Sequence, residues 1–301
     1  MSKLSGISLF LMSAVCLLSS SGVASAQRAT PTHKDIAYDN THPAQKLDVY
    51  LAKSKAPTAV MIYIHGGGWR AGSKKNVPAW LTTAVREGWL SVVSVEYRFT
   101  NVAPHPAQVN DCTRAVQFVR QNAAKWNIDT ERMGVTGGSA GAHLSLWVAL
   151  HDDTAKVDSA DPIARQSSRV ACAISFAGPT DWSLLKEIEH RHPAYRQLLG
   201  YQPGTAVDKM DAKKMADVSP ISFASKDDPP ILLVHGDNDN IVPFAHAKKM
   251  NTRLKDIGVR TELVVIKGAP HSVAGAAGKV SQRAAEFTRE ILQRPNSTGT
   301  R

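Results

Sequence analysis

Short apolar runs alternate with amphipathic segments along most of the chain. Runs rich in Val, Ile and Leu predict strands at 34–38, 47–51, 59–64, 91–97, 132–136, 170–176, 231–234 and 262–266. Helices are predicted at 78–87, 105–126, 142–150, 243–257 and 279–293; in the second of these, Val109, Cys112, Val116 and Val119 recur at helical spacing. Strands that alternate with helices predict an α/β fold, with a mostly parallel central sheet and helices on both faces.

One segment, 178–229, does not fit this alternation. It separates two core strands and contains apolar and aromatic residues, among them Trp182 and Tyr195. We interpret it as a small helical cap inserted above the active site. The alternative is a helical crossover with a surface excursion, in which case the aromatic side chains belong to the core.

The two ends of the chain differ from the rest. Residues 1–26 combine a positive start at Lys3, an apolar run over 7–18 and an Ala24-Ser25-Ala26 cleavage site. This pattern predicts a signal peptide, since the apolar run is too short to span a membrane. We therefore expect a secreted or periplasmic protein, with one domain over 27–294 and a disordered polar tail over 295–301.

Charge and cysteine content narrow the function classes. The formal net charge is +10, from 36 Lys and Arg against 26 Asp and Glu, but the basic residues are scattered in small groups. A scattered basic surface without interleaved aromatic residues does not predict a nucleic-acid partner. Cys112 and Cys172 remain after cleavage and are expected to be separate core thiols, although export also permits a disulfide between them. Their spacing does not indicate a metal site.

A candidate nucleophile lies between a strand and a helix. Residues 137–141 read Gly-Gly-Ser-Ala-Gly, which matches G-x-S-x-G in a strand–turn–helix context. Such a turn exposes the serine oxygen, and glycines at 137 and 141 leave room where a Cβ would press on neighbouring backbone. Ser139 is therefore the predicted nucleophile.

A glycine-rich loop follows an earlier strand. His65-Gly66-Gly67-Gly68-Trp69 comes directly after the run 59–64. Its backbone N–H groups can converge on a developing negative oxygen, as an oxyanion hole requires. A flexible or phosphate-binding loop is the alternative, but no Lys-Ser/Thr follows and no G-x-G-x-x-G is present.

A nucleophilic serine needs a base, and the base needs an orienting acid. His271 follows the last predicted strand on a loop with Gly268 and Pro270. Asp237 and Asp239 both follow the strand 231–234, and both are candidates for the acid. The chain order serine, aspartate, histidine is the order of the α/β-hydrolases.

Together these motifs resemble the α/β-hydrolase esterases, close to the hormone-sensitive-lipase and feruloyl-esterase-like (BD-FAE-like) carboxylesterases. The matching pieces are His65–Trp69, Tyr97-Arg98, Pro104–Ala107 with Asp111, Gly137–Gly141, His235-Gly236 through Val242-Pro243, and His271. The resemblance implies an α/β-hydrolase domain over 27–294. It also implies Asp239 rather than Asp237 as the acid, and the N–H groups of Gly67, Gly68 and Ala140 as oxyanion donors.

Other conspicuous residues receive structural interpretations. His143 is expected to be a hydrogen-bonded core histidine, His65 to brace the glycine loop, and Arg98 to pair with Asp111. His190 and His192 are expected at the surface, because residues two apart on a helix do not face one ligand. For Trp69 both options stay open, lining the acyl pocket or packing under the loop; the predicted pocket consists of Trp69, Trp182 and Tyr195.

The sequence thus predicts a serine-dependent carboxylic ester hydrolase with no cofactor or metal. Its expected substrates are short-acyl or aromatic esters, either small molecules or groups linked to polysaccharide. Alternatives are a polysaccharide-directed feruloyl or acetyl esterase, an arylformamidase-like amide hydrolase, and a non-enzymatic binding protein on a hydrolase scaffold. Neither a nucleic-acid partner nor stable membrane insertion is expected, and the oligomeric state is left open.

Overall fold

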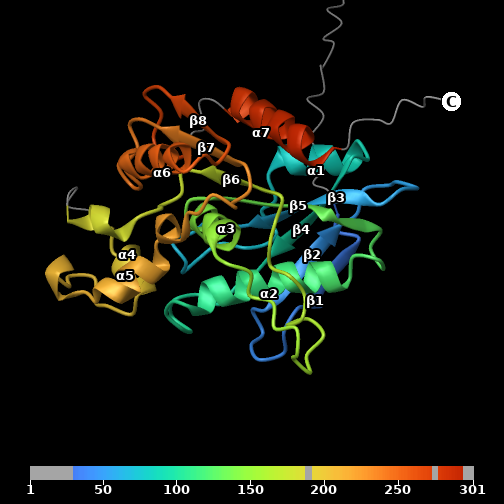
Figure 1. Cartoon of the computed structure of the whole chain (residues 1–301), viewed down its shortest axis with the longest axis horizontal. Helices are drawn as coiled ribbons and strands as arrows, with labels where there is room; N and C mark the ends of the chain where they lie inside the picture. The colour runs from blue at the N-terminus through green and yellow to red at the C-terminus, as the bar shows by residue number, and fades with distance from the viewer. Residues whose placement is uncertain (1–29, 187–191, 273–276, 294–301) are drawn as a thin grey trace, which may run out of the picture.

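The computed structural model describes residues 30–186, 192–272 and 277–293, so the predicted signal peptide and tail lie outside the described residues. At its centre is an eight-stranded sheet in the order β1-β2-β4-β3-β5-β6-β7-β8 (Figure 1). The strands are β1 (His33–Ala37), β2 (Lys46–Tyr50), β3 (Thr58–Ile64), β4 (Leu90–Val95), β5 (Ile128–Gly138), β6 (Cys172–Phe176), β7 (Ile231–Gly236) and β8 (Thr261–Ile266). Only β2 pairs antiparallel, with β1 and β4, while the other neighbours run parallel. The predicted, mostly parallel sheet is confirmed.

Helices cover both faces of the sheet, as predicted. Buried residues of α2 (Ala107–Gln121), α3 (Ala140–Leu150) and α6 (Ala245–Asp256) belong to one hydrophobic cluster. Those of α1 (Ala79–Arg86) and α7 (Ala277–Leu292) belong to a second cluster on the opposite face. Figure 1 shows α2 and α3 in front of the strands, with α1 and α7 close to each other along one side. This three-layer arrangement is that of an α/β-hydrolase.

The two cysteines lie in different layers. Cys112 belongs to the cluster under α2 and α3, and Cys172 to the cluster under α1 and α7. Both are free and fully buried, and burial raises the pKa of Cys172 to about 12 and that of Cys112 well above its ordinary value. The expectation of two separate core thiols is confirmed.

The helix predicted over 105–126 is shorter in the structure. It begins after Pro106 and ends at Gln121, and the chain then turns through Asn127, whose φ is +52°. Asn tolerates this left-handed conformation, which directs the backbone into β5. Ala123 and Trp126 are nevertheless buried, so the helical spacing of apolar residues continues past the helix itself.

The segment 178–229 folds as a series of short helices. These are η1 (Trp182–Leu185), α4 (Ala194–Leu198), η2 (Val207–Lys209), α5 (Ala212–Val218) and η3 (Pro220–Phe223). Side chains of α3 anchor the end of α5: Trp147 Nε1 donates to Asp217 O at 2.8 Å, and His143 Nε2 lies 2.7 Å from Val218 O. At α4, Gln197 accepts a hydrogen bond at 3.1 Å from Arg70, which directly follows the glycine loop. The segment therefore packs against the elements that carry the motifs, and its role as a cap stays a prediction.

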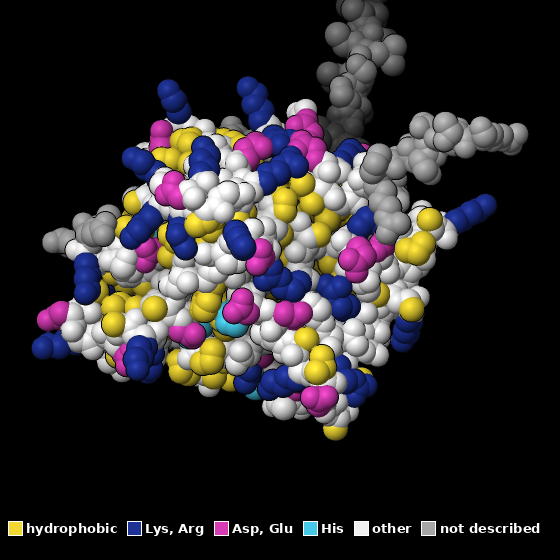
Figure 2. All heavy atoms as spheres, in the orientation of Figure 1, with side chains coloured by type: hydrophobic (Ala, Val, Ile, Leu, Met, Phe, Trp, Pro, Cys, Tyr) yellow, Lys and Arg dark blue, Asp and Glu magenta, His cyan; other side chains and the backbone are white. Residues whose placement is uncertain are grey.

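The surface carries both signs of charge. On the face shown in Figure 2, Lys and Arg side chains are spread widely, with acidic side chains between them. This distribution agrees with the scattered basic groups in the sequence. Among the described helices, none combines the length and apolar character needed to cross a membrane.

Candidate active site

Ser139 lies in a strained turn between β5 and α3. Its backbone has φ +54° and ψ −120°, and its N–H donates to Phe176 O at 2.8 Å. A Cβ on Gly137 or Gly141 would lie less than 3.0 Å from the carbonyl oxygen of Ile64. Only glycine at these two positions lets the turn lie this close to the end of β3, as the sequence predicted. The serine side chain is thereby held at the tip of the turn.

His271 connects the serine to an aspartate. It follows β8, and its Nε2 lies 2.9 Å from Ser139 Oγ. Its Nδ1 lies 2.7 Å from Asp239 Oδ2. The His271 side chain is 24% exposed, so solvent and small molecules can reach the imidazole from one side.

Asp239 is held ionised and in one orientation. Its Oδ1 accepts hydrogen bonds from the N–H groups of Ile241 and Val242, both at 2.9 Å, which leaves Oδ2 to face His271. Burial opposes the charge, but the hydrogen bonds from His235, His271 and these two amides outweigh it and hold the pKa of Asp239 well below its ordinary value.

The competing candidate, Asp237, points elsewhere. It is exposed and accepts a hydrogen bond from Gly268 N–H. The geometry therefore favours Asp239 over Asp237 as the partner of His271. His235 belongs to the motif that located the acid, and the structure adds its contact: its Nε2 lies 3.2 Å from Asp239 Oδ2.

The glycine loop has an unusual backbone. Gly67, Gly68 and Trp69 have φ values of +120°, +59° and +57°. The turn closes when the N–H groups of Arg70 and Ala71 donate to Gly67 O. Within the described residues, the N–H groups of Gly67 and Gly68 donate to no protein group, and neither does that of Ala140 at the start of α3. These three amides are free to receive an oxygen from a substrate.

His65 braces the loop from below, as predicted. Its Nδ1 lies 2.8 Å from Gly66 O, and its Nε2 lies 2.7 Å from Glu96 Oε1. The other carboxylate oxygen of Glu96 accepts from Lys74 N–H at 3.2 Å. Glu96 thus ties both ends of the loop to the end of β4. The sequence gives no signal for this role beyond a charged residue after an apolar strand.

The predicted pocket residues Trp69, Trp182 and Tyr195 form a buried aromatic cluster. Ring centroids are 5.8 Å apart for Trp69 with either partner and 5.1 Å apart for Trp182 with Tyr195. Their exposed fractions are 2%, 0% and 2%, which leaves no ring surface for a substrate. The structure therefore favours the alternative in which these rings belong to the core and Trp69 packs under the loop.

His143 is a core histidine, as expected. Trp69 Nε1–H donates to its Nδ1 at 3.1 Å, and its Nε2 lies 2.7 Å from Val218 O. Burial lowers the pKa of His143 to about 3, so the ring is neutral at pH 7. With Nδ1 accepting, the proton resides on Nε2 and is donated to Val218 O.

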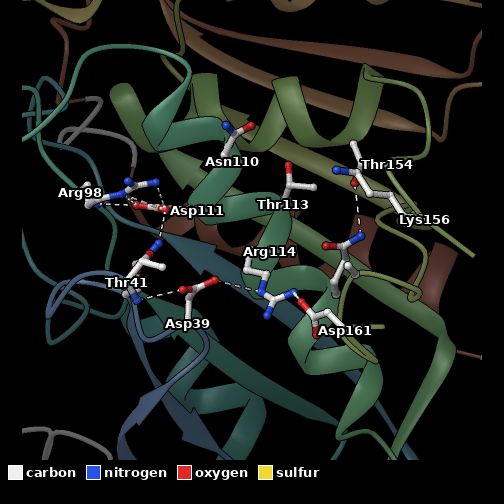
Figure 3. A pocket seen from close by; sticks show the side chains of 13 residues that line it. Asp39, Thr41, Arg98, Asn110, Asp111, Thr113, Arg114, Thr154, Lys156 and Asp161 are labelled. Atoms are coloured by element: carbon white, nitrogen blue, oxygen red, sulfur yellow. Dashed lines mark hydrogen bonds and ion pairs between the residues drawn. The ribbon is translucent and has the colours of Figure 1, made fainter. Parts of the chain in front are cut away.

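The predicted Arg98–Asp111 pair is present at the edge of a polar pocket of about 490 Å³ (Figure 3). Arg98 Nη2 lies 2.7 Å from Asp111 Oδ1, and Gln45 Nε2 donates to the same oxygen at 2.8 Å. Nearby, Arg114 pairs with two other acidic side chains of the pocket wall, those of Asp39 and Asp161. These paired charges connect surface loops to α2 and indicate a structural role.

One histidine of the segment 178–229 lies close enough to the site to interact with it. His192 is partly exposed, in agreement with the predicted surface position. Burial, followed by the electrostatic effect of Arg70 and His271, lowers its pKa. His190 lies outside the described residues.

Comparison with known proteins points to one family. The BD-FAE family model matches residues 47–254. The probable carboxylic ester hydrolase LipM of Mycobacterium tuberculosis is 29% identical over 229 residues, which are 74% of this chain and 52% of LipM. Esterase LipQ of the same organism is 29% identical over 269 residues, which are 86% of this chain and 61% of LipQ. The match thus spans only about half to three fifths of the length of these relatives.

A solved structure supports the same conclusion. A truncated carbohydrate esterase from gut microbiota superposes with a TM-score of 0.77 and 26% identity, over 89% of this chain and 99% of that one. The family model covers more than half of the present chain, and the sheet order and helix layers agree with the fold. The chain therefore belongs to the BD-FAE family and has the α/β-hydrolase fold.

Proposed function

We propose that the protein is a serine-dependent carboxylic ester hydrolase, with Ser139 as nucleophile, His271 as base and Asp239 as orienting acid. The observation that carries this proposal is the continuous hydrogen-bonded chain from Ser139 Oγ through His271 to the buried carboxylate of Asp239. The names of LipM, LipQ and the gut-microbiota carbohydrate esterase support the ester bond as the target.

The first half-reaction forms an acyl-enzyme. His271 Nε2 takes the proton of Ser139 Oγ as this oxygen attacks the ester carbonyl carbon. The carbonyl oxygen becomes negative and is received by the N–H groups of Gly67, Gly68 and Ala140. The ionised Asp239 stabilises the imidazolium that forms, and His271 then protonates the departing alcohol as the C–O bond breaks.

The second half-reaction reverses these roles. His271 removes a proton from a water molecule, whose oxygen attacks the acyl carbon of the ester on Ser139. Collapse of the second tetrahedral intermediate returns the proton to Ser139 Oγ and releases the carboxylic acid. Every proton in this cycle passes through His271, so the proposed mechanism uses only side chains and amides of the chain.

For the substrate, we propose short-acyl or aromatic esters, as small molecules or as substituents of polysaccharide. The structural neighbour named as a carbohydrate esterase supports the polysaccharide option, and a secreted or periplasmic location would bring the enzyme to such substrates. We keep the cap as a proposal for the segment 178–229 because α4 contacts Arg70, next to the glycine loop, through Gln197. In this proposal Trp182 and Tyr195 anchor the segment in the core and do not line the pocket.

The decisive experiment compares Ser139→Ala with Ser54→Ala, a control serine on an exposed loop. With p-nitrophenyl acetate, Ser139→Ala should lose at least ~10³-fold in kcat, because removing a triad member leaves only binding and oxyanion stabilisation. A fluorophosphonate probe should label the wild type and Ser54→Ala but not Ser139→Ala. Turnover that survives in Ser139→Ala would refute the assignment, and an inactive, unlabelled wild type would support a binding protein.

The formamidase alternative needs a separate comparison. Phenyl formate and formanilide differ only in the atom that leaves with the ring, oxygen or nitrogen. We expect hydrolysis of the ester with little turnover of the amide. Comparable kcat/KM values for both substrates would instead favour an arylformamidase-like enzyme.

A further inference from the structure

The polar pocket beside the Arg98–Asp111 pair lies against α2, apart from the candidate active site (Figure 3). Segments that are distant in the sequence form its walls, chiefly the β1–β2 loop, α2 and the loop that follows α3. Its volume is about 490 Å³, and every lining residue except Ala164 has a polar or charged side chain. Of the described residues, none that belongs to the candidate triad lines this pocket. A ligand bound here would therefore occupy a separate site.

The charged side chains of the pocket balance one another. Arg98 pairs with Asp111, and Arg114 pairs with the two other carboxylates of the lining. Lys156 raises the number of positive groups to three, which equals the number of carboxylates. A charged ligand of either sign would meet as many like charges as opposite ones, and like charges placed together are unfavourable. The lining therefore favours a neutral ligand.

Four polar groups of the pocket have no hydrogen-bond partner within residues 30–186, 192–272 and 277–293. Thr113 is 6% exposed, and its buried hydroxyl makes no hydrogen bond. Gln117 donates through Nε2 to Gln166 O at 2.8 Å, which leaves its Oε1 free. The other two groups are the side-chain amide of Asn110 and Nζ of Lys156, both on exposed residues. A polar group that is buried without a partner is costly, so the Thr113 hydroxyl in particular indicates a missing ligand.

These free groups form an extended row. Asn110, Thr113 and Gln117 are three and four residues apart on α2, so they share one face of the helix. At 1.5 Å per residue, the row from Asn110 to Gln117 is about 10 Å long. Lys156 belongs to the loop that follows α3 and lines the same pocket (Figure 3). A single ion could not reach both ends of this row, whereas an extended ligand could.

The chemistry of the row fits hydroxyl groups. Lys156 only donates hydrogen bonds and Gln117 Oε1 only accepts them, while the Asn110 amide and the Thr113 hydroxyl can do both. An alcohol hydroxyl also donates and accepts, so a polyhydroxylated chain can satisfy all four groups. A cavity of about 150 Å³ binds benzene, so this larger pocket has room for about two sugar rings. Because no aromatic side chain of the described residues lines the pocket, hydrogen bonds rather than ring stacking would hold the ligand.

We propose that this pocket is a second, non-catalytic site that binds a neutral oligosaccharide through the side chains of Asn110, Thr113, Gln117 and Lys156. The ion pairs of Arg98 and Arg114 hold the walls of the site in place. No group of the candidate triad takes part, so the proposal does not depend on the esterase function.

The first test is calorimetric titration of xylotriose, cellotriose and maltotriose, which contain no ester bond. The pocket variant Asn110→Ala/Lys156→Met changes two exposed residues, and Asn76→Ala/Lys125→Met removes the same groups from exposed positions outside the pocket. At least one trisaccharide should bind to wild type and control, and at least ~tenfold more weakly to the pocket variant, because two hydrogen bonds are lost. Equal affinity in the two variants, or no binding to wild type, would overturn the proposal. So would binding of inorganic phosphate or calcium in place of the sugars.

The second test removes only the buried hydroxyl. Thr113→Val keeps the shape of the side chain and loses a group that has no partner in the described protein. The urea midpoint should therefore not decrease, while trisaccharide affinity should fall about fivefold, the worth of one hydrogen bond. A lower midpoint would show that the hydroxyl has a structural partner, and an unchanged affinity would show that the ligand does not reach it. Either result contradicts the role of Thr113 on which the proposal depends.

Hydrolysis assays then separate the pocket from the esterase assignment and identify the source of the sugar chain. All variants should hydrolyse p-nitrophenyl acetate equally. Where the trisaccharide binds as expected, a lower kcat/KM on acetylated xylan in the pocket variant alone identifies the ligand as the main chain of a polymeric substrate, and equal values identify a free oligosaccharide. Trisaccharide binding without hydrolysis of any ester supports the pocket and refutes the esterase. Normal hydrolysis without trisaccharide binding overturns the pocket and leaves the esterase function intact.

Discussion

Acidification should destabilise the protein through His143, which has no place in the proposed chemistry. The folded chain holds this ring neutral, with Nδ1 accepting from Trp69 and Nε2 donating to Val218. Protonation would turn Nδ1 into a donor that faces another donor, in a fully buried site. Burial lowers the pKa of His143 to about 3, whereas the unfolded chain titrates near 6.5.

The sign and size of the effect follow from these two pKa values. Between pH 3 and pH 6.5 the unfolded chain binds the proton and the folded chain does not, so the free energy of unfolding decreases as the pH falls. At pH 5 the difference of 1.5 pH units from the unfolded value corresponds to ~2 kcal/mol, and at pH 7 the contribution is close to zero.

Urea unfolding at pH 7 and pH 5 measures this directly, and His143→Gln provides the comparison. Gln keeps one acceptor and one donor but does not titrate. His143→Gln is expected to be less stable than wild type at pH 7, yet to lose ~2 kcal/mol less between pH 7 and pH 5. An identical loss in both proteins would show that His143 is not the buried neutral group inferred from the structure.

Three further predictions concern the triad, the serine turn and the aromatic cluster. Asp239→Asn should lower kcat ~10³- to 10⁴-fold, because the two amides that donate to Oδ1 would turn the Asn NH₂ toward His271. Asp237→Asn should change kcat less than ~threefold. Steady-state kinetics of the two variants test this, and the reverse ranking would show that Asp239 is not the acid. Gly141→Ala should lower the free energy of unfolding by more than ~2 kcal/mol, because its Cβ would meet the backbone at the end of β3, whereas Gly138→Ala should be tolerated. Urea unfolding measures both variants. Equal stability of the two would contradict the close contact of the serine turn with β3. Trp182→Ala should cost ~3–5 kcal/mol of unfolding free energy, as expected for a fully buried ring, and a loss below ~1 kcal/mol would argue that the ring faces a substrate cavity instead.

The order of elements could be predicted from the sequence because burial on both faces demands continuous apolar strands. β3, β4 and β7 are buried along their whole length, and their runs of Val, Ile and Leu are visible without a structure. The end of α2 was misplaced for the same reason. Apolar spacing reports burial, and Trp126 stays buried after the helix has ended.

The motifs located Ser139 and His271 because a strained turn and a loop histidine require particular neighbours in the chain. The role of Glu96 could not be predicted, because it depends on a contact between the ends of two strands, which leaves no local pattern. Trp182 shows another limit of the sequence, because an aromatic residue in an inserted segment can belong to the core.

The two buried thiols can also be used to measure local opening of the native structure. A thiol reagent reacts with thiolate, and burial both shields the sulfurs and raises their pKa values. Cys112 can therefore react only when the layer of α2 and α3 separates from the sheet, and Cys172 only when the layer of α1 and α7 does. Labelling rates at the two sulfurs, followed by mass spectrometry in the native protein, would time the opening of each face separately. If the rates differ, the two helical layers open as distinct cooperative units.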